Sequence, residues 1–311
     1  MLIPMYLSEY LLLQFRMMNR KILDFGLKPL PGYLLMVAVF SFVSILLFSK
    51  TTLAGYLLTI TGLSVLAGLS DTGPNDFLRA IYSRRQYGWI RLTENGLVIL
   101  PIAIVLLIRL EWVPLLVMIG GAILFAWVSF RASYSVTIPT PFTRQPFEFL
   151  TGSRKTFLYL LFGYFLMVMS MLYKNYNLGI FSLLFHYLIY LSYYAQPENE
   201  FFVWIHSLTP ERFLLRKIQM SMLHSTMISI PIFVALVLAF PAETGWSFLF
   251  LLMGFTALIT VILAKYAAYP RQINLPQIIL LFLGIYFPFL MLGIIPYFYR
   301  QSIRKLNEYL A

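Results

Sequence analysis

Long apolar runs separated by short polar turns occupy most of the chain. Eight of them, extended by flanking residues where short, approach the roughly 20 residues that a helix needs to cross a bilayer. A membrane β-barrel would instead show short segments of alternating polarity. The pattern therefore predicts an all-α, polytopic helical membrane protein. The eight runs cover residues 31–49, 53–69, 96–108, 112–130, 156–173, 178–195, 218–240 and 246–265.

The longer polar intervals divide these runs into two groups of four. In each group a polar loop follows the second run, and Asn75-Asp76-Phe77 in the first loop is echoed by Asn199-Glu200-Phe201 in the second. An even number of spans per group gives both groups the same orientation, which is a parallel repeat. We therefore predict two parallel four-span repeats at residues 31–130 and 156–266, with a cytoplasmic linker at 131–155 between them.

The two ends of the chain add further segments. Residues 1–30 contain an amphipathic stretch that predicts a helix lying in the membrane interface, or alternatively a helix packed on the rest of the protein. These residues lack the basic start and small-residue cleavage site of a signal peptide. Residues 267–311 predict a C-terminal membrane segment and a basic tail, in which 275–299 either crosses once or is broken at Pro288 and Pro296 into a re-entrant hairpin.

Composition supports a membrane protein and charge sets its orientation. Sixty per cent of the residues are apolar and 11% are charged, against about 25% charged in soluble proteins. The net charge of +11 comes from basic residues in short loops, which report topology rather than nucleic-acid binding. A cytoplasmic N-terminus places 17 of the 23 Lys and Arg residues inside. We therefore predict a multi-pass protein of a bacterial inner membrane with its N-terminus in the cytoplasm.

The sequence offers little catalytic chemistry. It has no cysteine, no glycine-rich nucleotide loop of the Walker type and no histidine pair with metal-ligand spacing. We predict no catalytic, cofactor or metal site. Glu94 is interpreted as part of a helix-start cluster. His186, the one titratable residue deep in a run, has a packing role or a proton-relay role as alternatives.

Aromatic residues suggest two kinds of surface. The tyrosines at 187, 190, 193 and 194 pack between helices or line a path for an amphipathic or lipid-like cargo. In the second polar loop Phe201, Trp204 and Ile205 share one face of a short helix, and Phe77 and Ile81 repeat this face in the first loop. Such a helix binds a partner protein or lies flat among lipid headgroups.

Three features resemble the permease subunits of bacterial ATP-binding-cassette (ABC) exporters. They are the N-terminal amphipathic helix, the segment SLTPERFLLRKIQMSMLHSTMISIPIFVALVL in which a Thr-Pro pair opens a span, and the closing YFYRQSIRKLNEYL. Eight or nine spans depart from the usual six-span permease of that family. This difference fits an internally duplicated permease in which one chain supplies both halves.

The resemblance implies that cytoplasmic coupling helices at 75–83 and 199–207 dock on separate ATPase subunits, which hydrolyse ATP. It implies membrane lipid as the other partner, no nucleic acid and no covalent chemistry in this chain. A secondary transporter with a four-plus-four repeat and a non-transporting membrane scaffold are the alternatives. The implied contact residues are Asn75, Asp76, Phe77, Arg79, Ile81, Asn199, Glu200, Phe201, Trp204, Ile205 and Arg212.

Overall fold

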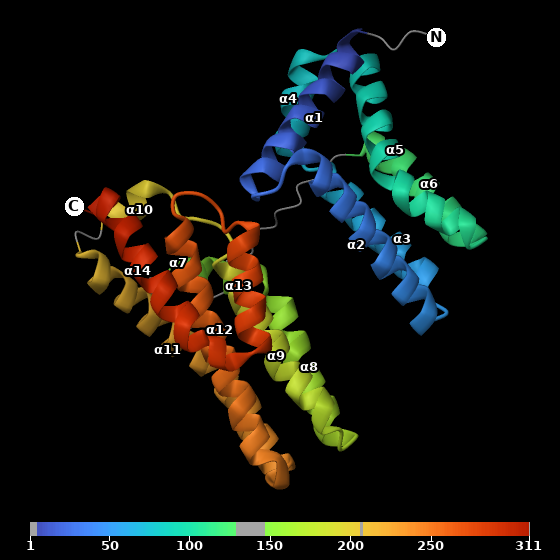
Figure 1. Cartoon of the computed structure of the whole chain (residues 1–311). Coiled ribbons are helices and arrows are strands. Elements are labelled where there is room, and N and C mark those ends of the chain that lie inside the picture. Colours follow the sequence, from blue (N-terminus) through green and yellow to red (C-terminus); the bar gives the residue numbers. More distant parts are fainter. Residues whose placement is uncertain (1–4, 129–146, 206–207, 311) are drawn as a thin grey trace. The chain divides into compact units, whose positions relative to one another are not determined.

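The computed structural model describes residues 5–128, 147–205 and 208–310, and all regular structure in these ranges is helical (Figure 1). The chain forms two compact units. Unit 1 comprises residues 1–23 and 27–135, and unit 2 comprises 24–26 and 136–311. Most of the predicted linker lies outside the described residues. Its last nine residues form a helix of unit 2, α7 (Phe147–Lys155).

Unit 1 is built around three packed helices. Buried side chains such as Leu66, Leu106 and Met118 form its core between α3, α5 and α6, and α2 packs against α3. The N-terminal amphipathic helix is present as predicted. The helices are α1 (Met5–Asp24), α2 (Pro29–Lys50), α3 (Ala54–Leu69), α4 (Thr72–Ile81), α5 (Arg84–Ile108) and α6 (Trp112–Trp127).

Unit 2 is built around one central helix, α12, which packs against α9, α11, α13 and α14. Leu258, Ile262 and Tyr266 of α12 are fully buried in this core. Short 3-10 turns lie at Pro241–Glu243 (η1) and Pro288–Leu290 (η2). After α7 the helices are α8 (Phe157–Leu172), α9 (Tyr176–Tyr193), α10 (Glu200–Trp204), α11 (Pro210–Ala239), α12 (Thr244–Ala268), α13 (Leu275–Tyr286) and α14 (Met291–Leu310).

Two long helices begin earlier than the apolar runs that predicted them. α5 begins after Ser83, which forms a capping box with Gln86, and α11 begins at Pro210 after Thr209. Glu94 therefore lies inside α5, and its interpretation as a helix-start residue is wrong. Hydropathy alone does not mark these starts because the first turns of both helices are polar, whereas Thr209 as a cap and Pro210 at the first helical position correctly predict the start of α11.

Four described helices are long and apolar enough to cross a membrane: α2, α5, α11 and the segment Pro241–Ala268 that contains α12. A fifth is counted if α7 and α8, which are bent by 72°, form one broken span. Large apolar side chains on α2, such as Val37 and Phe42, are exposed, as lipid-facing positions are. The described chain is thus an all-α protein with membrane-type helices, and the count of eight spans stays a prediction.

The C-terminal apolar run forms a hairpin of α13 and α14. The helix breaks at Pro288, whereas Pro296 lies inside the continuous helix α14. The Tyr309 ring packs at 5.1 Å from that of Tyr269, which follows the last residue of α12. Because α13 begins a few residues after Tyr269, both ends of the hairpin lie at the C-terminal end of α12.

The contact between α8 and α9 depends on a glycine. A Cβ at Gly163 would overlap with the His186 ring. We therefore expect Gly163→Ala to lower the free energy of unfolding by about 1–3 kcal/mol. Gly68→Ala is the matched control, because a Cβ there meets no heavy atom within 4 Å. Thermal unfolding in detergent should show a lower midpoint for the first variant only, and equal midpoints would contradict this packing argument.

Candidate functional site

Short helices occupy both predicted coupling loops. In unit 1, α4 connects α3 to α5, and in unit 2, α10 connects α9 to α11. The predicted segment 75–83 overlaps α4, while 199–207 contains α10. Residues 206–207 lie outside the described part of the chain. Amphipathic helices were therefore correctly expected in both loops, and α10 is only about one turn long.

The apolar faces of α4 and α10 are exposed. Phe77 and Trp204 expose 66% and 65% of their surface, and Ile81, Phe201 and Ile205 are also more than half exposed. On the opposite side of α10, Val203 is fully buried and attaches the helix to unit 2. Each helix thus presents large apolar side chains outward, as a binding surface does.

Two asparagines at matching positions have different structural roles. The Asn75 side chain is buried, donates to the carbonyl oxygens of Leu69 and Asp71 at 2.9 and 2.7 Å, and accepts from the Tyr87 hydroxyl at 3.0 Å. It holds α4 against its neighbours and does not lie on the exposed face. The Asn199 side chain is exposed and caps α10 by accepting from Phe201 N at 3.1 Å.

Charged residues border the exposed apolar faces. Asp76 and Arg79 of α4 are exposed and 3.9 Å apart, and the Arg79 guanidinium lies 5.0 Å from the centre of the Tyr87 ring. Glu200 of α10 and Arg212 in the first turn of α11 are also exposed. α4 therefore presents acidic and basic groups beside apolar ones, whereas α10 itself presents an acidic one.

At the loop that leads into α10, unit 2 buries a group of charges that we call the charge cluster. It comprises Glu148 of α7, Glu198 in the loop before α10, Lys217 of α11, and Lys265 and Tyr266 of α12. The exposed fraction of its charged side chains runs from 2% at Lys265 to 14% at Glu198. Two acidic and two basic side chains thus meet in the charge cluster.

Each lysine of the charge cluster bridges both carboxylates. Lys217 Nζ lies 3.0 Å from Glu148 Oε2 and 2.7 Å from Glu198 Oε1. Lys265 Nζ lies 3.1 Å from an oxygen of each carboxylate. The Tyr266 hydroxyl donates to Glu198 Oε1 at 2.8 Å. Glu198 therefore ties the base of α10 to α7, α11 and α12.

The surroundings of Glu198 keep it ionised. Burial by itself would raise its pKa, but the hydrogen bond with Glu148 and the charges of Lys217 and Lys265 lower the pKa of Glu198 further than burial raises it. A carboxylate at this position is consistent with the two ammonium groups that it accepts from.

Unit 1 has a smaller buried ion pair near α4. Arg91 Nη1 lies 2.7 Å from Glu94 Oε2, and the Arg91 side chain is 2% exposed. The Tyr10 hydroxyl of α1 donates to Glu94 Oε1 at 3.1 Å, and Arg91 Nη2 donates at 3.1 Å to Oγ of Ser70, the residue that caps the end of α3. Burial and the adjacent Glu94 raise the pKa of Tyr10. The pair thus joins α1, α3 and α5.

The tyrosines and histidine of α9 lie inside the bundle. Tyr187, Tyr190 and Tyr194 are buried, as expected if they pack between helices. His186 is also fully buried, and its Nδ1 lies 2.9 Å from Ser182 O of the same helix. Among the described residues no group of three His, Cys, Asp or Glu side chains is placed to hold a metal ion.

Sequence reasoning missed the charge cluster because its members come from four separate segments. Glu148 was placed in a linker, and Lys265 at the end of a run was counted only for topology. The sequence signal was that Lys217 directly precedes the run 218–240 and Lys265 ends the run 246–265. Comparison of the chain with protein-family models, with characterised proteins and with solved structures finds no match.

Proposed function

We propose that this chain is the membrane-spanning permease subunit of an ATP-driven exporter of the ABC type, located in a bacterial cytoplasmic membrane with its N-terminus inside. It binds separate ATPase subunits through α4 and α10. The observation that carries this proposal is the combination of exposed apolar faces on both helices with buried polar anchors at their bases. A helix that transmits movement from a partner needs an exposed face to bind that partner and a buried contact that connects it to the bundle.

The charge cluster gives α10 a mechanical connection to the bundle. When nucleotide binding closes the ATPase pair, α10 moves with it, and Glu198 passes this movement to α11 and α12 through Lys217 and Lys265. Asn75 and Tyr87 connect α4 to α5 in the same way. The bundles then rock about a cargo path, with no covalent step in this chain.

The alternative is that α4 and α10 lie flat among lipid headgroups. Exposed Phe and Trp side chains suit that environment. Asp76 and Glu200, however, place carboxylates on or beside these exposed faces, where an anionic membrane surface repels them. A protein partner with basic and apolar groups satisfies both kinds of side chain.

Co-purification tests the proposal. The tagged chain is isolated from the membranes of its native host in a mild detergent, and Mg-ATP hydrolysis and peptide mass spectra are measured on the eluted material. We expect an ABC-type ATPase in stoichiometric amount, with hydrolysis that follows the tag. A chain that elutes alone and supports transport in vesicles without ATP would disprove the assignment.

A further inference from the structure

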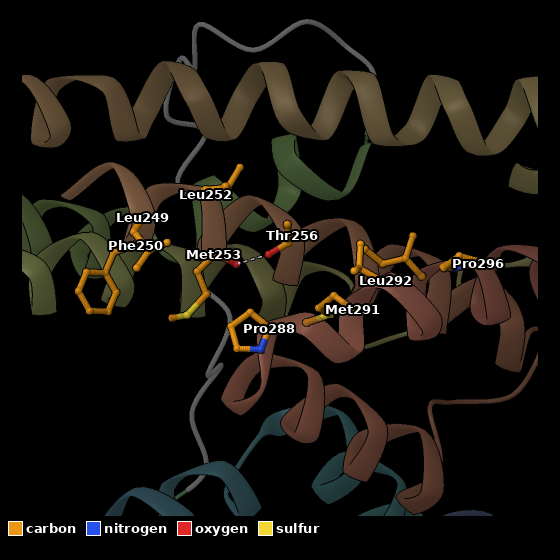
Figure 2. Close-up of a pocket in the computed structure, with 10 residues that line it drawn as sticks. Leu249, Phe250, Leu252, Met253, Thr256, Pro288, Met291, Leu292 and Pro296 are labelled. Atoms are coloured by element: carbon orange, nitrogen blue, oxygen red, sulfur yellow. Dashed lines mark hydrogen bonds between the residues drawn. The ribbon is translucent and has the colours of Figure 1, made fainter. Parts of the chain in front are cut away.

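An apolar groove runs between α12 and the C-terminal hairpin in unit 2 (Figure 2). Its volume is about 440 Å³, within the range of small-molecule sites. Leu249, Met253 and Thr256 of α12 line one side, and Pro288 and Leu292 line the other. Except for the Thr256 hydroxyl, which donates to Met253 O of its own helix at 3.0 Å, the lining side chains are apolar.

A second, basic cavity of about 550 Å³ continues from this groove along α14. Pro296 lines both cavities, so that they are adjacent. Arg300 and Arg304 line the second cavity and share one helix face because they are four residues apart. The helical rise places Arg300 roughly 12 Å along the axis from Leu292. One elongated ligand can therefore occupy the groove and reach the arginines.

Both arginines of this cavity, Arg300 and Arg304, carry charges that no other described residue neutralises. Arg300 and Arg304 are exposed and form no ion pair with another described residue, whereas the adjacent Lys305 pairs with Glu308 at 3.1 Å. Guanidinium groups bind phosphate through two parallel hydrogen bonds. The two free arginines at the end of an apolar groove indicate a ligand with one apolar and one anionic end.

The positions of the two cavities along the apolar segment match the acyl chain and the headgroup of a membrane lipid. The Ser302 hydroxyl donates to Leu263 O at 2.7 Å, near the C-terminal end of α12, whereas the groove lies beside residues 249–256 earlier in that helix. The arginines therefore lie toward the end of the apolar segment, where headgroups are found, and the groove lies at the depth of acyl chains.

We propose that this composite site binds one anionic phospholipid, with an acyl chain in the groove and the phosphate at Arg300 and Arg304. Free phosphate would leave the groove empty, and a neutral lipid would leave the two charges unneutralised. A peptide would bring backbone polar groups into a groove that offers them no partners. The site uses no residue of α4 or α10 and does not depend on the coupling function.

Lipid titration of the full chain tests this site. The delipidated protein in neutral detergent is titrated with dioleoyl phosphatidylglycerol or dioleoyl phosphatidylcholine, and bound lipid is counted by native mass spectrometry. We expect phosphatidylglycerol to bind at least about tenfold more tightly. The double substitution Arg300→Gln with Arg304→Gln should remove this preference, while Lys305→Gln on the same helix should keep it.

A groove variant separates chain binding from headgroup binding. Leu292→Trp fills the groove and leaves both arginines in place, so we expect it to weaken binding of both lipids. Equal thermal midpoints without lipid would establish that the variants fold. The proposal is overturned if the arginine variant keeps the preference for phosphatidylglycerol, or if Leu292→Trp binds it like the original chain. The proposal is also overturned if millimolar inorganic phosphate displaces phosphatidylglycerol, because the arginines would then bind phosphate without a lipid.

Discussion

Lys265→Met should lower the free energy of unfolding by about 3–5 kcal/mol, because it removes one partner from a buried ion network. The Lys265 side chain is 2% exposed and contacts both carboxylates of the charge cluster at 3.1 Å. Without it, the buried Glu148 and Glu198 keep only Lys217 as a cationic partner. The large effect follows from leaving buried acidic groups with one partner fewer and not from the strength of any one contact.

Denaturant or thermal unfolding in detergent measures this loss. Lys305→Met is the matched control, since the pair of Lys305 and Glu308 is 40% and 53% exposed and should contribute less than about 1 kcal/mol. Combining Lys265→Met with Glu198→Gln removes one charge of each sign and should cost less than the sum of the single changes. Additive losses would show that the cluster does not act as one unit.

The sequence predicted most long helices and, from the Thr-Pro pair at 209 and 210, the polar start of α11, but not the polar start of α5. Apolar runs of the right length locate α2, α11 and α12 because lipid-facing helices need apolar side chains all round. The polar first turns of α5 and α11 carry no such signal. Only capping residues such as Ser83 and Thr209 mark where these helices begin.

The candidate site was predictable in its location but not in its anchoring. The exposed faces of α4 and α10 follow from helical spacing of Phe77 with Ile81 and of Phe201 with Trp204. Which of two matching asparagines is buried does not follow from spacing, because burial depends on the packing of α3 and α5. The charge cluster joins residues as far apart as Glu148 and Lys265, so only the tertiary fold reveals it.

The hairpin of α13 and α14 shows the same limit. By the local rule, Pro288 and Pro296 are equally able to break a helix. The structure breaks only at Pro288, since α14 continues past Pro296 while packed along α12. The lost backbone hydrogen bond at Pro296 is thus compensated by tertiary contacts, which a local rule does not include.

Trp204→Ala should reduce ATPase binding by about 30-fold or more, equivalent to roughly 2 kcal/mol, because exposed aromatic residues dominate protein interfaces. Phe77→Ala should have a similar effect through α4. Trp204 is 65% exposed in the isolated chain, so its removal should leave thermal unfolding nearly unchanged. The measurement is the affinity of the co-purified ATPase for each variant in detergent, with nucleotide-dependent hydrolysis recorded in parallel.

Trp246→Ala provides the control for Trp204→Ala. Trp246 is 59% exposed but lies in the first turn of α12, whereas Tyr266 near the other end of that helix contacts the loop before α10. If α10 is the docking surface, only the Trp204 variant loses the ATPase. If both variants lose it equally, the effect comes from membrane anchoring, and the headgroup interpretation of α10 replaces the coupling one. Loss of hydrolysis with unchanged affinity would instead place the defect in transmission through Glu198.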